Sequence, residues 1–216
     1  MSVARGLEKR LEKLIEGVAG RIFSGRLHPS ELAGRLAREA DFARFDHPSG
    51  PATANLFVIG VNPKDLTMDA GELAAMLTEE MTSYTAEEGL RLEGPVTVRI
   101  EADETTPSGR AVCHVEVVPG PPVVWAQLTA GHEIIDIGRN RAIVGRSPDC
   151  DTTVSHDDIS RRHALVFREL GQSWIVDLKS ANGTTVDGQR VGSEPVPLQH
   201  GSTVTMGEHR YRFREV

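Results

Sequence analysis

The C-terminal half of the chain alternates short β-type runs with turn residues, and this pattern constrains the fold more than any other feature. Asp187-Gly188, between Thr184-Thr185-Val186 and Gln189-Arg190-Val191, is a strong signal for a two-residue hairpin. Many short strands with regular turns predict an all-β sandwich over residues 123–216. The other expected strands are 125–128, 133–137, 142–144, 163–167, 174–178, 203–206 and 211–213.

Three polar clusters occupy the turns between these expected strands. They are Gly145-Arg146-Ser147, Ser160-Arg161-Arg162-His163 and Ser180-Ala181-Asn182-Gly183-Thr184. Sandwich loops gather at the ends of the sheets, so we expect the polar side chains of the three clusters to lie close together. Guanidinium groups, a hydroxyl and turn amides bind a phosphate ester, which carries about −1.5 to −2 charges at neutral pH. Taken alone, each arginine, serine or asparagine of the clusters is more typical of a solvated or capping turn residue. The occurrence of all three clusters in this order, each between expected strands, favours the phosphate site.

These clusters closely resemble the motif of the forkhead-associated (FHA) domain, a β-sandwich that binds phosphothreonine, and the resemblance covers residues 123–216. It implies that Arg146 and Ser160 contact the phosphate, that Arg161 supports it and that Asn182 binds the peptide main chain. Many family members have serine or threonine where this chain has Ala181, so we expect weaker affinity without loss of binding. The resemblance also gives supporting roles to Gly145, Ser147, His163, Gly183 and Thr184.

Residues 1–118 predict a separate α+β domain with the order ααβαββ. Apolar residues at spacings of three and four predict a helix over 7–22, and a second helix is expected from His28-Pro29. A buried strand over 56–59 should end at Gly60, and a third helix should begin at Asp69 and end before Gly89. Alternation over 96–100 and 111–117 predicts a hairpin across the loop 102–109. Residues 119–122, Pro-Gly-Pro-Pro, form a short linker between the domains.

The N-terminal sequence also resembles a known family. Residues 7–17, Leu-Glu-Lys-Arg-Leu-Glu-Lys-Leu-Ile-Glu-Gly, followed by Pro29-Ser30-Glu31-Leu32-Ala33, are similar to the N-terminal domain of the bacterial FhaA family, which precedes an FHA domain. That resemblance implies a role in cell-wall synthesis or division, downstream of membrane Ser/Thr kinases. The short linker departs from the long low-complexity linker of the family.

Composition argues against several classes of function. A net charge of −7 disfavours a general binder of nucleic acids or anionic membranes, and the basic residues near the first helix interleave with acids. No segment has the pattern of a signal peptide or the roughly 20 apolar residues of a membrane span. We therefore expect a cytoplasmic protein with no nucleic-acid partner and no membrane insertion.

Catalytic and metal-binding patterns are also weak. Cys113 and Cys150 have no zinc or disulfide spacing, and the histidines show no metal-ligand pairing. Ser155-His156-Asp157 contains the residue types of a hydrolase triad, but consecutive side chains point apart and cannot form the required relay. The acids at 149, 151, 157 and 158 lack the glycine and glutamate of a calcium loop. We expect no cofactor, no metal and no enzymatic activity.

The sequence thus predicts an adaptor that binds phosphothreonine in a Ser/Thr kinase or in its substrates. The alternative is a protein docked by its FHA domain whose N-terminal domain has another activity or binds nucleic acid. Thr105 and Thr106, within Asp103-Glu104-Thr105-Thr106-Pro107, are candidate phosphorylation sites in an expected exposed loop. Phosphorylation there would offer the FHA site an internal ligand. The competing interpretation is an ordinary polar loop that is never modified.

Overall fold

The computed structural model describes residues 27–66 and 69–216, which form two compact units. The first unit contains residues 27–45, 52–85 and 92–120 within the described ranges. The second contains 121–216 together with two earlier segments, 46–51 and 86–91. The proposed domain boundaries, 1–118 and 123–216 around the linker 119–122, remain a prediction. The expected helix over 7–22 lies outside the described residues.

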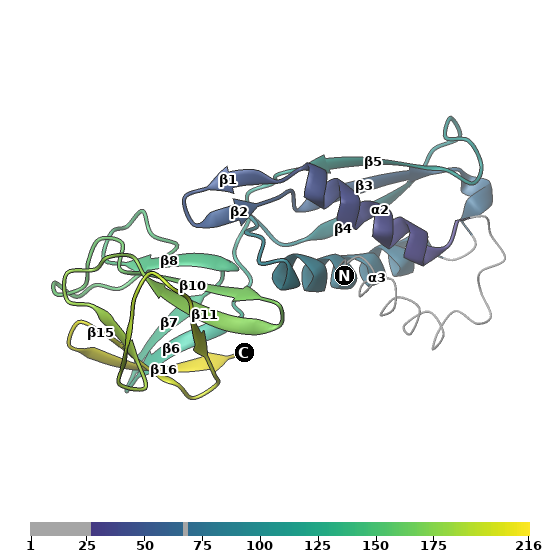
Figure 1. Cartoon of the computed structure of the whole chain (residues 1–216). Coiled ribbons are helices and arrows are strands. Elements are labelled where there is room, and N and C mark those ends of the chain that lie inside the picture. The colour runs from purple at the N-terminus through teal and green to yellow at the C-terminus, as the bar shows by residue number, and fades with distance from the viewer. Residues whose placement is uncertain (1–26, 67–68) are drawn as a thin grey trace. The chain divides into compact units, whose positions relative to one another are not determined.

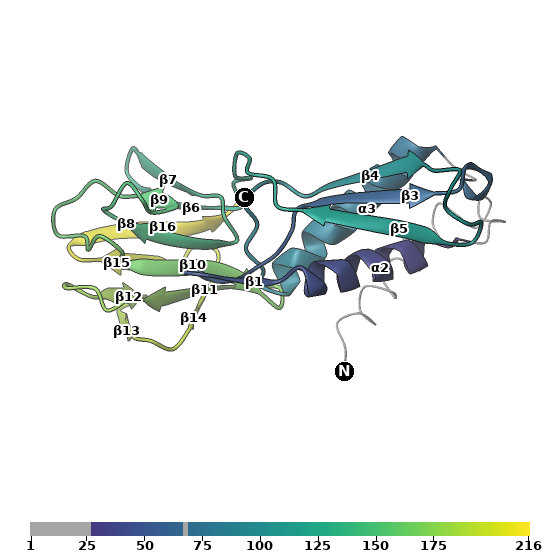
Figure 2. The ribbon, with the colours of Figure 1, turned by 90° about the horizontal axis from the view of Figure 1, so that it is seen from above.

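The described residues of the first unit form two α-helices and a three-stranded sheet (Figures 1 and 2). Helix α2 (Pro29–Phe42) begins where the sequence predicts, because the His28 side chain accepts a hydrogen bond from the Ser30 amide at 3.3 Å. Helix α3 (Ala70–Glu87) is capped by Asp69, whose Oδ1 accepts from the Glu72 amide at 2.9 Å. The chain continues through β3 (Leu56–Val61), the short 3₁₀ helix η1 (Pro63–Asp65), β4 (Thr97–Ala102) and β5 (Ala111–Glu116).

The predicted hairpin between 96–100 and 111–117 is wrong. The strand order is β4-β3-β5, in which β3 pairs in parallel with β4 and antiparallel with β5. The apolar β3 takes the central position, and helix α3 returns the chain so that β4 runs parallel to it. Gly60, expected to end this strand, lies within it because it keeps both partners, Glu101 and Val112. The sequence prediction also missed a short hairpin, β1 (Phe45–His47) with β2 (Gly50–Ala52).

The second unit contains a β-sandwich, as predicted. One sheet has the order β14-β11-β10-β8-β9 and the other β13-β12-β15-β16-β6-β7 (Figure 2). The first sheet contains β8 (Arg141–Gly145), β9 (Thr152–Thr153), β10 (Ala164–Glu169), β11 (Gln172–Asp177) and β14 (Val196–Leu198). The second contains β6 (Ala126–Ala130), β7 (Glu133–Ile137), β12 (Thr184–Val186), β13 (Gln189–Val191), β15 (Thr203–Met206) and β16 (His209–Glu215). The sequence prediction missed only β9 and β14, which have two and three residues.

Alternation along the strands divides the apolar residues between two faces of the first sheet. Val144, Val166 and Ile175 are fully buried in the core between the sheets. Their neighbours Ile143 and Phe167 form a second buried cluster with Leu165. The predicted hairpin at Asp187-Gly188 is confirmed, with both residues in the left-handed region at φ 50° and 84°. The loops at the end of the sandwich near Gly145 carry the candidate site.

Candidate functional site

The loop after β8 is held against the loop that precedes β10. The Arg146 amide donates to the Ser160 carbonyl at 2.9 Å, and the Ser147 amide donates to the Arg161 carbonyl at 3.1 Å. A side chain at Gly145 would collide with the Arg161 carbonyl, so only glycine permits this approach of the two backbones. The first two polar clusters of the sequence are therefore joined through their main chains.

The buried side chain of His163, in the second cluster, connects Ser160 of its own loop to Gly183 of the third cluster. Its side chain is fully buried, with Nδ1 3.1 Å from the Ser160 amide and Nε2 3.2 Å from the Gly183 carbonyl. The amide can only donate and the carbonyl can only accept, so the ring is neutral with its proton on Nε2. Burial lowers the pKa of His163, which favours the same neutral form. One imidazole thus fixes the distance between two loops.

The third cluster is a turn organised by Asp177. Its carboxylate accepts hydrogen bonds from the Ser180 hydroxyl at 2.6 Å and from the Thr184 hydroxyl at 2.7 Å. Burial alone would raise the pKa of Asp177, but these hydrogen bonds outweigh burial and lower it. Gly183 adopts φ +81°, a conformation that favours glycine, and its amide donates to the Ser180 hydroxyl. The turn presents residues 181 and 182 at the surface.

Two contacts connect this turn to the second cluster. The Ala181 amide donates to the Ser160 hydroxyl at 2.9 Å, and Asn182 Nδ2 donates to the Asp158 carbonyl at 2.7 Å. Asp158 is itself fixed, because its carboxylate accepts from the Glu208 amide at 2.7 Å and lies 2.8 Å from His209 Nε2. The hydrogen bond from the Glu208 amide is the main reason that the pKa of Asp158 is lowered.

The four residues predicted to bind a phosphopeptide are brought together. Arg146, Ser160, Arg161 and Asn182 line one cavity of about 830 Å³. The arginine side chains are exposed, and Arg146 Nε donates to the Ile159 carbonyl at 3.2 Å. Of the predicted supporting residues, Ser147 also lines the cavity, whereas Gly145, His163, Gly183 and Thr184 are buried behind it.

Sequence reasoning missed the part of this cavity that comes from outside residues 123–216. His47, Pro48 and Arg91 line it together with the loops of the sandwich, although the sequence places them far from the three clusters. His47-Pro48-Ser49-Gly50 carries a turn signal, which could have revealed the β1–β2 hairpin. Nothing in the sequence indicates that Arg91 lies in this cavity.

The candidate phosphorylation sites differ in accessibility. Thr105 is exposed, but Thr106 is only 2% exposed, so the expectation of an exposed loop is wrong for that residue. Both hydroxyls donate to the carboxylate of Asp103, at 2.6 Å from Thr105 and 2.5 Å from Thr106. The hydrogen bonds, chiefly from Thr105, hold the pKa of Asp103 at about 2.

The metal-ligand, triad-like and cysteine patterns of the sequence form no assembled site among the described residues. Among residues 27–66 and 69–216, no three histidine, cysteine or acidic side chains are grouped as for a metal ion. His156, of the triad-like sequence, stacks on His209 at 3.6 Å between ring centroids and faces Glu133. Cys113 and Cys150 are free thiols. Within the described part of the chain, no helix is long and apolar enough to cross a membrane.

Comparison with known proteins gives two matches to family models. Residues 5–114 match the model of the FhaA N-terminal domain, which is about half of the chain, and residues 142–207 match the FHA domain. Glycogen accumulation regulator GarA of Mycolicibacterium smegmatis is 29% identical over 154 residues, covering 69% of this chain and 90% of GarA. The oxoglutarate dehydrogenase inhibitor of Corynebacterium diphtheriae is 32% identical over 114 residues, covering 53% and 71%.

Other relatives are much longer, and the chain spans 2 to 20% of their length. Among solved structures, the FhaA FHA domain complexed with the intracellular domain of Rv3910 is 27% identical with a TM-score of 0.37. That similarity covers 42% of this chain and 99% of the solved domain.

Proposed function

This chain belongs to the FhaA family of FHA-domain proteins, and on that premise we propose that it is an adaptor that binds phosphothreonine in partner proteins. FHA domains bind phosphothreonine. The partners that we propose are a bacterial Ser/Thr protein kinase or its substrates. We propose that the protein binds them in the cytoplasm. The family resemblance also supports a link to cell-wall synthesis or division.

The observation that carries this proposal is the set of polar groups that the cavity presents. The terminal nitrogens of Arg146 have no partner among the described residues, so the guanidinium can hold a phosphate. The Ser160 hydroxyl accepts from the Ala181 amide and keeps its own hydrogen to donate. Arg161, exposed beside them, adds a second positive charge. These groups suit a dianion with three acceptor oxygens.

Asn182 suits a different part of the ligand. Its Nδ2 is bonded to the Asp158 carbonyl, which fixes the side-chain amide and leaves Oδ1 to accept a hydrogen bond from a peptide amide. The three clusters are fixed by main-chain hydrogen bonds and by the neutral His163, so the site requires little ordering on binding. We therefore infer recognition of a phosphorylated residue together with the backbone that carries it.

A phosphopeptide array probed with the full chain tests the proposal. Each peptide is present in phosphothreonine, phosphoserine and unphosphorylated forms. We expect binding to a subset of the phosphothreonine peptides and none to their unphosphorylated forms. Binding that ignores phosphorylation would overturn the proposed function.

A further inference from the structure

His47, Pro48 and Arg91 share the cavity with the proposed phosphate-binding residues but have no role in the function proposed so far. They lie in segments 46–51 and 86–91, which belong to the second compact unit. We propose that these residues and Arg162 form a wall of the phosphopeptide site, and that this wall selects an acidic residue beside the phosphothreonine. The inference rests on the proposed phosphothreonine-binding function. The four residues are called the hairpin wall below.

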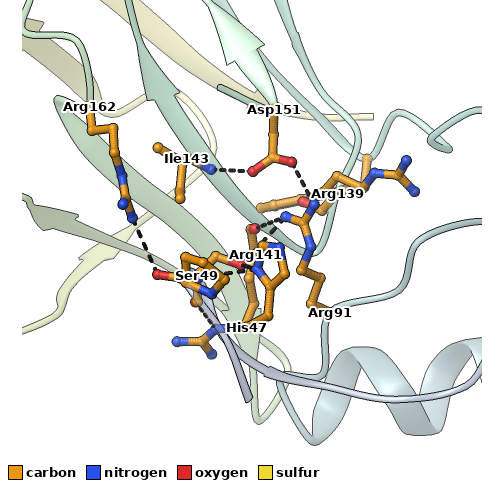
Figure 3. A network of polar contacts seen from close by, with 10 residues as sticks. His47, Ser49, Arg91, Arg139, Arg141, Ile143, Asp151 and Arg162 are labelled. Carbon is orange, nitrogen blue, oxygen red and sulfur yellow. Dashed lines mark hydrogen bonds and ion pairs between the residues drawn. The ribbon is translucent and has the colours of Figure 1, made fainter. Parts of the chain in front are cut away.

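The β1–β2 hairpin is fixed to the sandwich by Arg141. Its Nε donates to the Ser49 carbonyl at 2.7 Å (Figure 3). Its Nη1 donates to the Gly89 carbonyl at 3.2 Å. The guanidinium also lies 4.3 Å from the centre of the Phe167 ring. Gly50 has φ +120° and lies so close to Arg141 that a Cβ would collide with the guanidinium. The hairpin is therefore held in one position.

Arg91 connects the hairpin wall to β8, the strand that leads into the loop of Arg146. Its Nη2 lies 2.7 Å from Asp151 Oδ1, and the Arg91 side chain is 6% exposed. The other oxygen of Asp151 accepts from the Ile143 amide at 2.9 Å, two residues before Gly145 on β8 (Figure 3). Arg91 Nη1 also donates to the Arg141 carbonyl at 3.0 Å. A wall fixed in this way binds a peptide at a small entropic cost.

Arg162 gives the wall its charge. Its Nη2 donates to the Pro48 carbonyl at 3.3 Å, and its side chain is exposed. A guanidinium has five donors, so donors remain for a carboxylate of the ligand. Four acids line the cavity. Asp151 is paired with Arg91, Asp158 is held by the Glu208 amide and His209, and Asp149 accepts from the Ser147 hydroxyl at 3.2 Å, while Asp157 is exposed to solvent. Arg161 lies next in the chain and also lines the cavity, so the positive charge at this wall favours an acidic neighbour of the phosphothreonine.

The test measures the dependence of affinity on the residues around phosphothreonine, using the full chain. One phosphothreonine peptide that binds the full chain on the array is the starting point. For each position beside the phosphothreonine, two versions are made, one with aspartate and one with asparagine at that position. In the parent, aspartate at one position should raise affinity roughly two- to fivefold over asparagine. In Arg162→Gln this ratio should fall to about one. Arg210→Gln removes an exposed arginine of β16 that does not line the cavity, and it should keep the parent ratio.

Gly50→Ala tests the hairpin itself, because the added Cβ displaces the hairpin from Arg141. It should also lower the aspartate preference while phosphothreonine peptides still bind. An unchanged aspartate preference in Arg162→Gln or in a folded Gly50→Ala variant overturns the inference, as does a parent with no preference. If Gly50→Ala does not fold, the Arg162→Gln result alone decides. Failure of the proposed function would look different, since the parent would then bind no phosphothreonine peptide or would bind phosphorylated and unphosphorylated forms equally.

Discussion

Replacing Arg91 by methionine should destabilise the second unit strongly, because it leaves the Asp151 carboxylate without its counter-ion. The two side chains are 6% and 14% exposed, although the backbone of Asp151 is exposed. The change removes a charge-assisted contact of 2.7 Å, worth about 1.5 to 3 kcal/mol, and the bond to the Arg141 carbonyl, worth about 1 kcal/mol. We expect the free energy of unfolding to fall by about 3 kcal/mol, close to the lower end for a broken buried pair.

Tryptophan fluorescence during denaturant unfolding measures this loss in the correct unit. Trp125 and Trp174 are the only tryptophans of the chain, and both lie in the second unit. For a unit of about 100 residues, the same loss corresponds to a melting temperature lower by roughly 12 °C. The double variant Arg91→Met with Asp151→Asn should recover part of the stability, because no isolated charge remains.

The matched control is Arg210→Met, which removes an exposed arginine with no contact in the hairpin wall. It should change the free energy of unfolding by less than about 0.5 kcal/mol. A loss below about 1 kcal/mol in Arg91→Met, or a double variant that shows the full sum of the two single losses, would refute the assignment of Arg91 as an anchor.

Four further predictions concern the site. Arg146→Ala should weaken phosphothreonine-peptide binding by about 1.5 to 3 kcal/mol, a factor of roughly 10 to 150 in calorimetric titration, whereas Arg210→Ala should not change it. Phosphothreonine should be preferred to phosphoserine by about 0.8 kcal/mol, because the family resemblance implies that its methyl group packs near Asn182, and equal affinities of matched peptides would count against this. Burial lowers the pKa of His163 from 6.5, so its contribution to stability is present above that pH and is lost as the pH falls below it. Denaturant midpoints should therefore decline as the pH falls below 6.5, and His163→Asn should flatten this decline. Kinase treatment should modify the exposed Thr105 rather than Thr106 and reduce binding of external phosphopeptides, as mapped by mass spectrometry and titration; no phosphate at Thr105, or unchanged binding, would reject self-capture.

The strands of the sandwich and the loops of the candidate site are predictable from sequence because their signals are local. Alternating residues mark the strands, and Asp187-Gly188 marks a turn that requires left-handed backbone at both positions. The candidate site is carried by three short motifs, whose positions between the strands place them in loops at the same end of the sandwich. The supporting role of His163 stays a prediction, and in the structure its ring bonds the Ser160 amide and the Gly183 carbonyl.

The features that sequence did not predict depend on contacts between distant residues. Local alternation identifies β4 and β5 as strands, but it does not indicate that β3 lies between them. Arg91 and Asp151 are 60 residues apart, and neither has a neighbour that marks it as half of an ion pair. The hairpin at residues 46–51 is short and polar, so its packing on the sandwich follows from the Arg141 contacts and not from its own pattern.

The most direct test of phosphothreonine recognition is calorimetric titration of the full chain with one array-selected peptide in phosphorylated and unphosphorylated forms. Binding should be measurable for the phosphothreonine form and absent for the other. Arg146→Ala should lose most of it, because the terminal nitrogens of that guanidinium line the cavity and bond to no described residue. Equal binding of the two forms, or a variant that binds the phosphorylated peptide as tightly as the parent, would contradict the account.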